Sequence, residues 1–140
     1  KFDLIHSVDR WSLAQEINKR GQELGLEVPI LLQVNVSGEE TKHGLAPAEL
    51  RPFYAKVIEL SNLKVCGLMT MAPFVPDPEA TRPVFRGLRE LFQEIKREYQ
   101  PGAEWRHLSM GMSNDYEVAV EEGATLVRIG SAIFHAPKEG

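Results

Sequence analysis

The clearest strand in the sequence reads Ile30-Leu31-Leu32-Gln33-Val34-Asn35-Val36. One face of this run carries only aliphatic side chains, and the other carries Leu31 beside the polar Gln33 and Asn35. Both faces are therefore largely apolar, which is typical of a strand in a parallel sheet covered by helices. The run predicts an α/β fold built on parallel strands.

Short strand-like and longer helix-like periods alternate on either side of this run. We predict further strands at 4–8, 65–71, 105–110 and 126–129. Helical spacing of apolar residues predicts helices in the segments 9–25, 47–60, 77–99 and 114–123. The resulting order, βαβαβαβαβ, indicates parallel strands joined by right-handed helical crossovers.

Cap residues mark the expected ends of these helices. Asp9 or Ser7 is expected to cap the first helix, and Asp77 the third. Asn114 and Glu117 have the spacing of a capping box at the start of the last helix. Glycines at 25 and 123 stand where the first and the last helix should end.

Two architectures fit this order of elements. An open doubly wound sheet closes with five strands, whereas a (β/α)₈ barrel needs eight strands and typically ~250 residues. The length of 140 residues therefore favours the open sheet on pattern alone.

Composition excludes several classes of function. The chain has 16 Lys and Arg against 20 Asp and Glu, a net charge of -4 with the signs interspersed, which argues against nucleic acid and anionic membranes as partners. Its apolar runs are shorter than the ~20 residues of a membrane helix, and Lys1-Phe2-Asp3 does not open a signal peptide. We therefore expect a cytoplasmic protein. Cys66 is the only cysteine, so an internal disulfide is excluded and a buried thiol is expected.

Loops suited to an anion follow the last two predicted strands. Gly130 lets backbone amides approach a ligand, and Ser131 adds a hydroxyl at the start of an expected short helix. The segment 108–114 has the same small, hydroxyl-bearing and glycine-containing character. Ordinary turn chemistry explains either segment alone, but the pair favours a phosphate site like that of barrel enzymes.

Two further polar residues lie on the predicted strands. Arg128 lies between Leu126 and Gly130 on one face of a strand with apolar neighbours, so its guanidinium needs a ligand or a carboxylate. A buried structural ion pair is the alternative. Asn35 stands where side chains line the mouth of such a site, although a satisfied core amide explains it equally well.

Blocks of residues along the chain resemble one known family, the pyridoxal phosphate homeostasis proteins, which are single-domain relatives of the alanine racemase barrel. The resemblance implies a (β/α)₈ TIM-type barrel in place of the open sheet, with this chain supplying about the last five βα units, from the fourth strand on. The blocks are His6-Ser7-Val8-Asp9, Gln33-Val34-Asn35-Val36 through the segment 39–45, the segment 67–73, the segment 108–113 and the segment 127–134.

The resemblance also implies a pyridoxal 5'-phosphate site without a metal. Ser109 and Met110 would lie along the phosphate side of the cofactor, and Gly130 and Ser131 would donate hydrogen bonds to phosphate oxygens. Arg128 would face the pyridine nitrogen, where a guanidinium disfavours protonation and weakens the ring as an electron sink. Asn35, Met69 and Ser113 complete the expected set of cofactor-binding residues.

Members of this family carry the Schiff-base lysine on their first strand, and the first three βα units are absent from this sequence. We therefore expect residues 1–140 to form a single partial barrel domain, as a fragment, a processed chain or an incomplete gene model. Lys42 belongs to the family's loop pattern and matches no cofactor lysine. Exposed sheet edges predict association with the missing N-terminal half or self-association.

The function implied by the resemblance is binding and intracellular homeostasis of pyridoxal 5'-phosphate, by carriage and delivery of this small molecule rather than by catalysis. We do not expect an enzyme. One alternative is an amino-acid racemase-type enzyme that depends on the same cofactor, which in the related enzymes uses an additional tyrosine base from a second domain. The other is a barrel fragment that binds a phosphorylated metabolite without Schiff-base chemistry.

Overall fold

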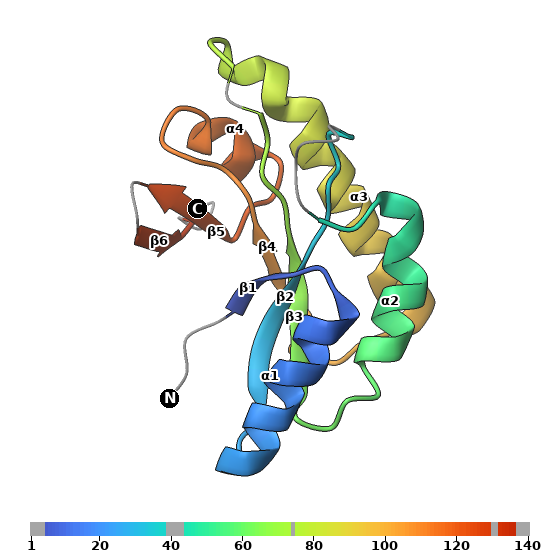
Figure 1. The fold of residues 1–140 in the computed structure, drawn as a ribbon. Helices are drawn as coiled ribbons and strands as arrows, with labels where there is room; N and C mark the ends of the chain where they lie inside the picture. Colours follow the sequence, from blue (N-terminus) through green and yellow to red (C-terminus); the bar gives the residue numbers. More distant parts are fainter. Residues whose placement is uncertain (1–4, 39–43, 74, 130–131, 137–140) are drawn as a thin grey trace.

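A computed structural model describes residues 5–38, 44–73, 75–129 and 132–136 (Figure 1). The strands are β1 (Ile5–Val8), β2 (Val28–Gln33), β3 (Leu63–Met69), β4 (His107–Ser109), β5 (Leu126–Ile129) and β6 (Ala132–His135). The α-helices are α1 (Trp11–Leu24), α2 (Leu50–Val57), α3 (Arg82–Tyr99) and α4 (Tyr116–Glu121), and short 3₁₀ turns η1 (Pro47–Glu49) and η2 (Pro78–Thr81) precede α2 and α3. Among these described residues, no helix has the length and apolar character needed to cross a membrane.

The strands lie side by side in the order in which they occur in the chain, from β1 to β6. Neighbouring strands from β1 to β5 pair in parallel, and β6 pairs antiparallel with β5. A doubly wound sheet reverses its strand order at a switch point, whereas a barrel winds in one direction. The open-sheet prediction from pattern alone is therefore wrong, because the chain continues in one direction around the sheet.

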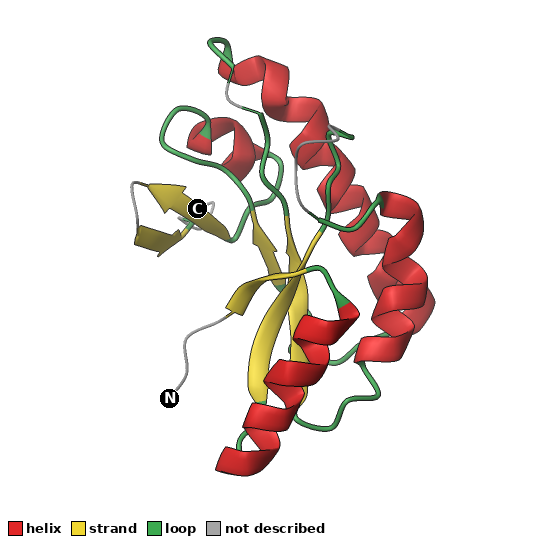
Figure 2. Ribbon diagram, viewed as in Figure 1, coloured by secondary structure: helices red, strands yellow, loops and turns green. Residues whose placement is uncertain are grey.

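The two faces of the sheet carry different side chains. Helices α1, α2 and α3 lie along one side of the central strands (Figure 2), where Ile30 and Leu32 belong to the main core. A separate cluster of buried residues comprises Leu31, Cys66, Met69 and Leu126. Alternation along β2 thus sends its side chains into two apolar environments, which confirms the expectation of two largely apolar faces.

An aromatic cluster attaches α3 to the segment before β4. The indole of Trp105 stacks on Phe92 with ring centroids 4.8 Å apart, and its Nε1 donates to the Phe92 carbonyl at 3.3 Å. Tyr54 of α2 meets the same indole edge-on at 5.4 Å. These contacts bury large ring surfaces while satisfying the indole N–H.

A bulge interrupts the pairing of β2 with β3. Ile30 pairs with Val65, but the next residue, Leu31, pairs with Gly67, so Cys66 is the extra residue. Gly67 has φ +150°, and a Cβ built on it would overlap the carbonyl oxygen of His107 in β4. The bulge also buries the thiol of Cys66, which is 7% exposed, as expected, and burial raises its pKa.

Several helix boundaries differ from the sequence predictions. Arg10 holds the N-cap position of α1 without a side-chain cap hydrogen bond, so neither Asp9 nor Ser7 is the cap residue. The capping box predicted at Asn114 is also wrong, because Asp115 and not Asn114 holds the N-cap position of α4. The Asn114 Nδ2 donates to the carbonyl of Val75 at 3.3 Å. Asp77 does act as a cap, but of η2, the turn that leads into α3: it accepts a hydrogen bond from the Glu79 N–H at 3.0 Å, while Thr81 holds the N-cap position of α3. The predicted end of the first helix is confirmed, since residue 25 ends α1 in the left-handed conformation.

The segment after β5 contradicts the expected short helix. Residues Ala132–His135 form β6, which pairs with β5 along Leu126–Ile129. Ile133 and Phe134 have the branched or aromatic side chains that favour strands, and the edge of β5 offers them a partner. Both side chains remain exposed, at 44% and 48%.

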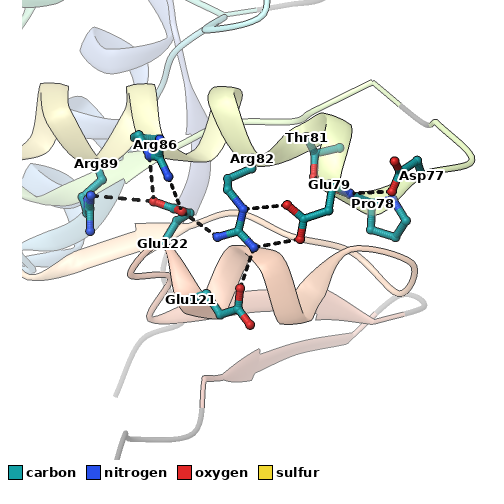
Figure 3. A network of polar contacts seen from close by, with 9 residues as sticks. All are labelled: Asp77, Pro78, Glu79, Thr81, Arg82, Arg86, Arg89, Glu121 and Glu122. Carbon is teal, nitrogen blue, oxygen red and sulfur yellow. Dashed lines mark hydrogen bonds and ion pairs between the residues drawn. The ribbon is translucent and has the colours of Figure 1, made fainter.

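Arginines of α3 surround the carboxylate of Glu122 at the end of α4 (Figure 3). Glu122 is only 4% exposed, and its Oε2 lies 2.7 Å from Arg82 Nη1 and 3.2 Å from Arg86 Nη2. Arg82 also pairs with Glu79 at 2.8 Å and Glu121 at 2.6 Å. This network holds α4 against α3 and so fixes one side of the segment between β4 and α4.

We expect Glu122→Gln to lower the free energy of unfolding by about 1–2 kcal/mol, because it weakens charge-assisted hydrogen bonds to a buried acceptor. Hydrogen bonding by Arg86, with a further contribution from Arg82, holds the pKa of Glu122 below its usual range. The contribution of its charge is therefore present above the unfolded pKa and lost as pH falls through the lowered folded pKa. Urea unfolding at pH 7 and pH 3 measures both effects, and equal losses at the two pH values contradict the assignment.

Candidate functional site

A small pocket, with room for about one water molecule, opens at the carboxyl ends of β3, β4 and β5, the edge of the sheet where parallel α/β proteins place their sites. The segments that leave these strands supply most of its wall, and α3 closes one side. Its lining residues are Thr70, Met71, Ala72, Phe85, Ser109, Met110, Gly111, Met112, Asp115 and Arg128. The side chains of the wall are apolar except for the hydroxyls of Thr70 and Ser109, the carboxyl group of Asp115 and the guanidinium of Arg128.

Arg128 lines this pocket, and its side chain has a buried donor without a partner in the described part of the chain. Its Nε is buried and has no hydrogen-bond partner among the described residues, and the described residues form no ion pair with it. Its backbone N–H is occupied, since it donates to the Gly111 carbonyl at 2.9 Å. A buried guanidinium donor without an acceptor is costly, so the pocket favours a ligand that brings an acceptor. The alternative of a structural ion pair has no support in this part of the chain.

The ends of β2, β3 and β4 are held together by hydrogen bonds at the floor of the pocket. Thr70 donates its backbone N–H to the Ser109 carbonyl at 3.1 Å and its hydroxyl to the Val34 carbonyl at 2.6 Å. Ser109 and Met110 are 1% and 2% exposed, and Met110 N–H donates to β5 at Leu126. The polar groups at this edge therefore lie on a rigid support, as a binding site requires.

Asp115 is the acidic residue of the pocket, and sequence reasoning missed it. It is 5% exposed, and its Oδ1 accepts a hydrogen bond from the Met112 N–H at 2.6 Å. Burial raises the pKa of this carboxyl, while hydrogen bonds from backbone N–H groups oppose the rise. The only signal in the sequence was its position directly after the serine and asparagine that follow β4, where an acidic residue is also an ordinary turn residue.

The structure brings together three of the predicted site residues and separates others. Ser109, Met110 and Arg128 line the pocket. Met69 is buried in the second core cluster at 1% exposure, one residue before the pocket wall. Ser113 is exposed and is not part of the wall.

Asn35 lies after β2, outside the pocket wall, and shapes the segment that follows it. Its Oδ1 accepts hydrogen bonds from the Ser37 hydroxyl and the Gly38 N–H, each at 3.1 Å. This is the Asx-turn use of an asparagine. Gly130 and Ser131, predicted on the phosphate side, and Lys42 lie outside the described residues.

Comparison with known proteins agrees with this geometry. The sequence pattern described as "Alanine racemase, N-terminal domain" matches residues 1–137. The chain belongs to this family. A member from Aquifex aeolicus (strain VF5), named pyridoxal phosphate homeostasis protein, is 52% identical over 134 residues, which cover 96% of this chain and 58% of that protein. The resemblance seen in the sequence is thereby confirmed, and the chain spans about half the length of the curated relatives it matches.

Solved structures give the same result for the fold. PipY of Synechococcus elongatus PCC7942 with PLP bound superposes with a TM-score of 0.78 at 35% identity, over 91% of this chain and 58% of PipY. Alanine racemase of Clostridium difficile 630 in complex with cycloserine is only 17% identical, with a TM-score of 0.68 over 89% of this chain and 34% of the racemase, and shares the fold alone. The alanine racemase-like TIM-type barrel fold of the chain is thus shown.

Proposed function

We propose that this chain forms the non-covalent part of a pyridoxal 5'-phosphate site, and that the protein binds and delivers the cofactor rather than catalysing a reaction with it. The observation that carries the proposal is the buried, unpartnered Nε of Arg128 in a pocket at the carboxyl edge of the sheet. The ring nitrogen and phosphate of the cofactor are acceptors of the kind this donor lacks. The names of the relatives and the cofactor bound to PipY support the same assignment.

Within this proposal each polar group has one task. Arg128 holds its guanidinium toward the pyridine nitrogen and opposes its protonation through its own positive charge. Ser109 and Met110 form the wall along the phosphate side, with Gly130 and Ser131 as donors to the phosphate and Asn35, Met69 and Ser113 around the mouth. When bound, the cofactor supplies an aldehyde and an electron-withdrawing ring.

No lysine lines the pocket within the described residues. The proposal therefore assigns the covalent link to a part of the barrel other than the five βα units of this chain, and residues 1–140 form one partial barrel domain. Strand order that follows chain order without a reversal supports this division. In the same proposal, the outer edge of β6 and the exposed side chains of Ile133 and Phe134 contact the rest of the barrel or a second copy of the chain. The proposed location of the protein is the cytoplasm.

A cofactor ring that withdraws electrons less strongly favours carriage of the cofactor over catalysis with it. Amino-acid racemisation draws electrons from the substrate into the cofactor ring, and a guanidinium beside the ring nitrogen disfavours the protonation that strengthens this withdrawal. A racemase-type function stays second for this reason. Exchange of alanine between its two enantiomers, followed by chiral chromatography with the cofactor and the full-length protein that carries the covalent lysine, tests it directly, and we expect none.

The proposed function is tested by binding of pyridoxine 5'-phosphate, which lacks the aldehyde and so reports the non-covalent site without reaction at surface lysines. We expect the chain to bind it and Arg128→Leu to weaken binding roughly 10- to 100-fold, the effect of losing a charge-assisted hydrogen bond. Fluorescence titration or calorimetry measures the affinity.

Arg20→Leu is the matched control, since Arg20 lies on α1 and pairs only at the surface with Glu16 at 3.4 Å. Its affinity should equal that of the unsubstituted chain. Equal binding by Arg128→Leu and Arg20→Leu contradicts the proposed site. Binding of inorganic phosphate with the same dependence on Arg128, but no binding of the pyridine compound, favours the phosphorylated-metabolite alternative.

A further inference from the structure

The turn between β4 and α4 is fixed by backbone hydrogen bonds to β5. Met110 N–H donates to the Leu126 carbonyl at 3.1 Å, and Arg128 N–H donates to the Gly111 carbonyl at 2.9 Å. These two hydrogen bonds join the backbone of the turn to β5, the strand that carries Arg128. Because the Gly111 carbonyl accepts the Arg128 N–H, a shift of Gly111 would also disturb the backbone of Arg128.

Gly111 lets this turn lie close to α4. Its φ is +102°, and a Cβ built there would lie 2.6 Å from the Cβ of Ala119. The conformation is open to glycine and strained for other residues. The turn is therefore held from the α4 side by close packing and from the β5 side by hydrogen bonds.

Asp115 fixes the turn at a third point, because its side-chain oxygen accepts a hydrogen bond from the turn. Asp115 holds the N-cap position of α4 but makes no side-chain cap hydrogen bond to that helix. Its Oδ1 instead accepts the Met112 N–H at 2.6 Å, and its backbone N–H returns to the Met112 carbonyl at 3.1 Å. A buried carboxyl normally costs stability, and the hydrogen bond from the turn offsets part of this cost.

We propose that Asp115 is a positioning residue of the cofactor pocket, which fixes the turn 110–113 and through Gly111 holds Arg128 in place for the ligand. This inference rests on the proposed function. The task needs an acceptor atom at the position of Oδ1 and does not need a negative charge. Since burial opposes ionisation of this carboxyl, an amide that retains the acceptor should replace it without loss.

Three variants separate positioning from a general structural role. Asp115→Asn keeps an acceptor oxygen, Asp115→Ala removes it, and Glu117→Ala on exposed α4 surface is the matched control. We expect Asp115→Ala to weaken binding of pyridoxine 5'-phosphate about tenfold, as for one lost buried hydrogen bond. Asp115→Asn and Glu117→Ala should stay within about twofold of the unsubstituted chain.

Amide hydrogen exchange provides a readout without ligand. In Asp115→Ala the amides of Met112 and Arg128 should exchange faster, while the amide of Leu32, in the central strand β2, keeps its protection. Asp115→Asn should restore the protection of both amides. If Asp115→Ala does not fold, Asp115→Ser takes its place, because it keeps a hydroxyl in the turn but withdraws the acceptor by one atom.

The outcomes distinguish this inference from the proposed function. If the unsubstituted chain binds and Asp115→Ala binds equally well, or if Asp115→Asn is as weak as Asp115→Ala, the positioning role is overturned. If the unsubstituted chain does not bind, the proposed function fails, and amide exchange still decides whether Asp115 fixes the turn. Unchanged exchange at Met112 and Arg128 in Asp115→Ala overturns that role as well.

Discussion

Replacing Gly67 by alanine is expected to lower the free energy of unfolding by about 3 kcal/mol or more. The new methyl group would overlap the His107 carbonyl, which belongs to the backbone of β4 and has no rotamer that moves it away. At φ +150° the alanine would also occupy a conformation that side chains rarely adopt. Both the overlap and the backbone strain would act at the bulge, where the register of β3 against β2 shifts.

Urea unfolding followed by circular dichroism measures this loss. Gly102→Ala is the matched control, because the three atoms nearest to its new Cβ all belong to the carboxylate end of Glu104, a flexible side chain that can move aside. We expect the control to stay within about 0.5 kcal/mol of the unsubstituted chain. Equal stability of the two variants contradicts the close approach of β3 and β4 at Gly67.

Phe85→Ala is expected to cost about 3–5 kcal/mol, the usual range for deleting a buried aromatic ring. Phe85 is fully buried on α3, where it belongs to the main core and also lines the pocket. Its loss removes both packing and one wall of the site. The same unfolding experiment measures the stability, and titration with pyridoxine 5'-phosphate measures the effect on the pocket.

Phe85→Leu is the conservative control for this position. It retains most of the buried volume, so we expect a loss under about 1.5 kcal/mol and an affinity closer to that of the unsubstituted chain. If Phe85→Ala lowers stability by less than Phe85→Leu, the ring does not support the core as described. If Phe85→Ala loses stability but binds the ligand unchanged, Phe85 belongs to the core alone.

The sequence predicted the elements well wherever local pattern and tertiary packing agree. The run around Ile30 was predicted as a strand with two largely apolar faces, and this was correct because side chains from both faces pack into apolar clusters. Asp77 was predicted correctly as a cap because its hydrogen bond, from the Glu79 N–H, is local in the sequence. The prediction at Asn114 failed because α4 begins one residue later, with Asp115 at its N-cap position, and the spacing of Asn114 and Glu117 alone does not fix where the helix begins.

The same distinction separates the site residues that were found from those that were missed. Arg128 was recognised because a charged residue within an apolar strand is unusual wherever the strand lies. Asp115 escaped notice because its burial depends on how α4 packs on the sheet. The bulge at Cys66 and Gly67 was invisible for a similar reason, since only the approach of β4 requires a glycine there.

The agreement between strand order and chain order has a consequence for how the protein is made. Each strand from β2 onward pairs with the strand that left the ribosome immediately before it. A growing chain therefore presents the edge of the preceding strand to each new strand from β2 onward, so each of these strands finds its first partner already synthesised. The sheet can assemble at the pace of translation, one βα unit at a time.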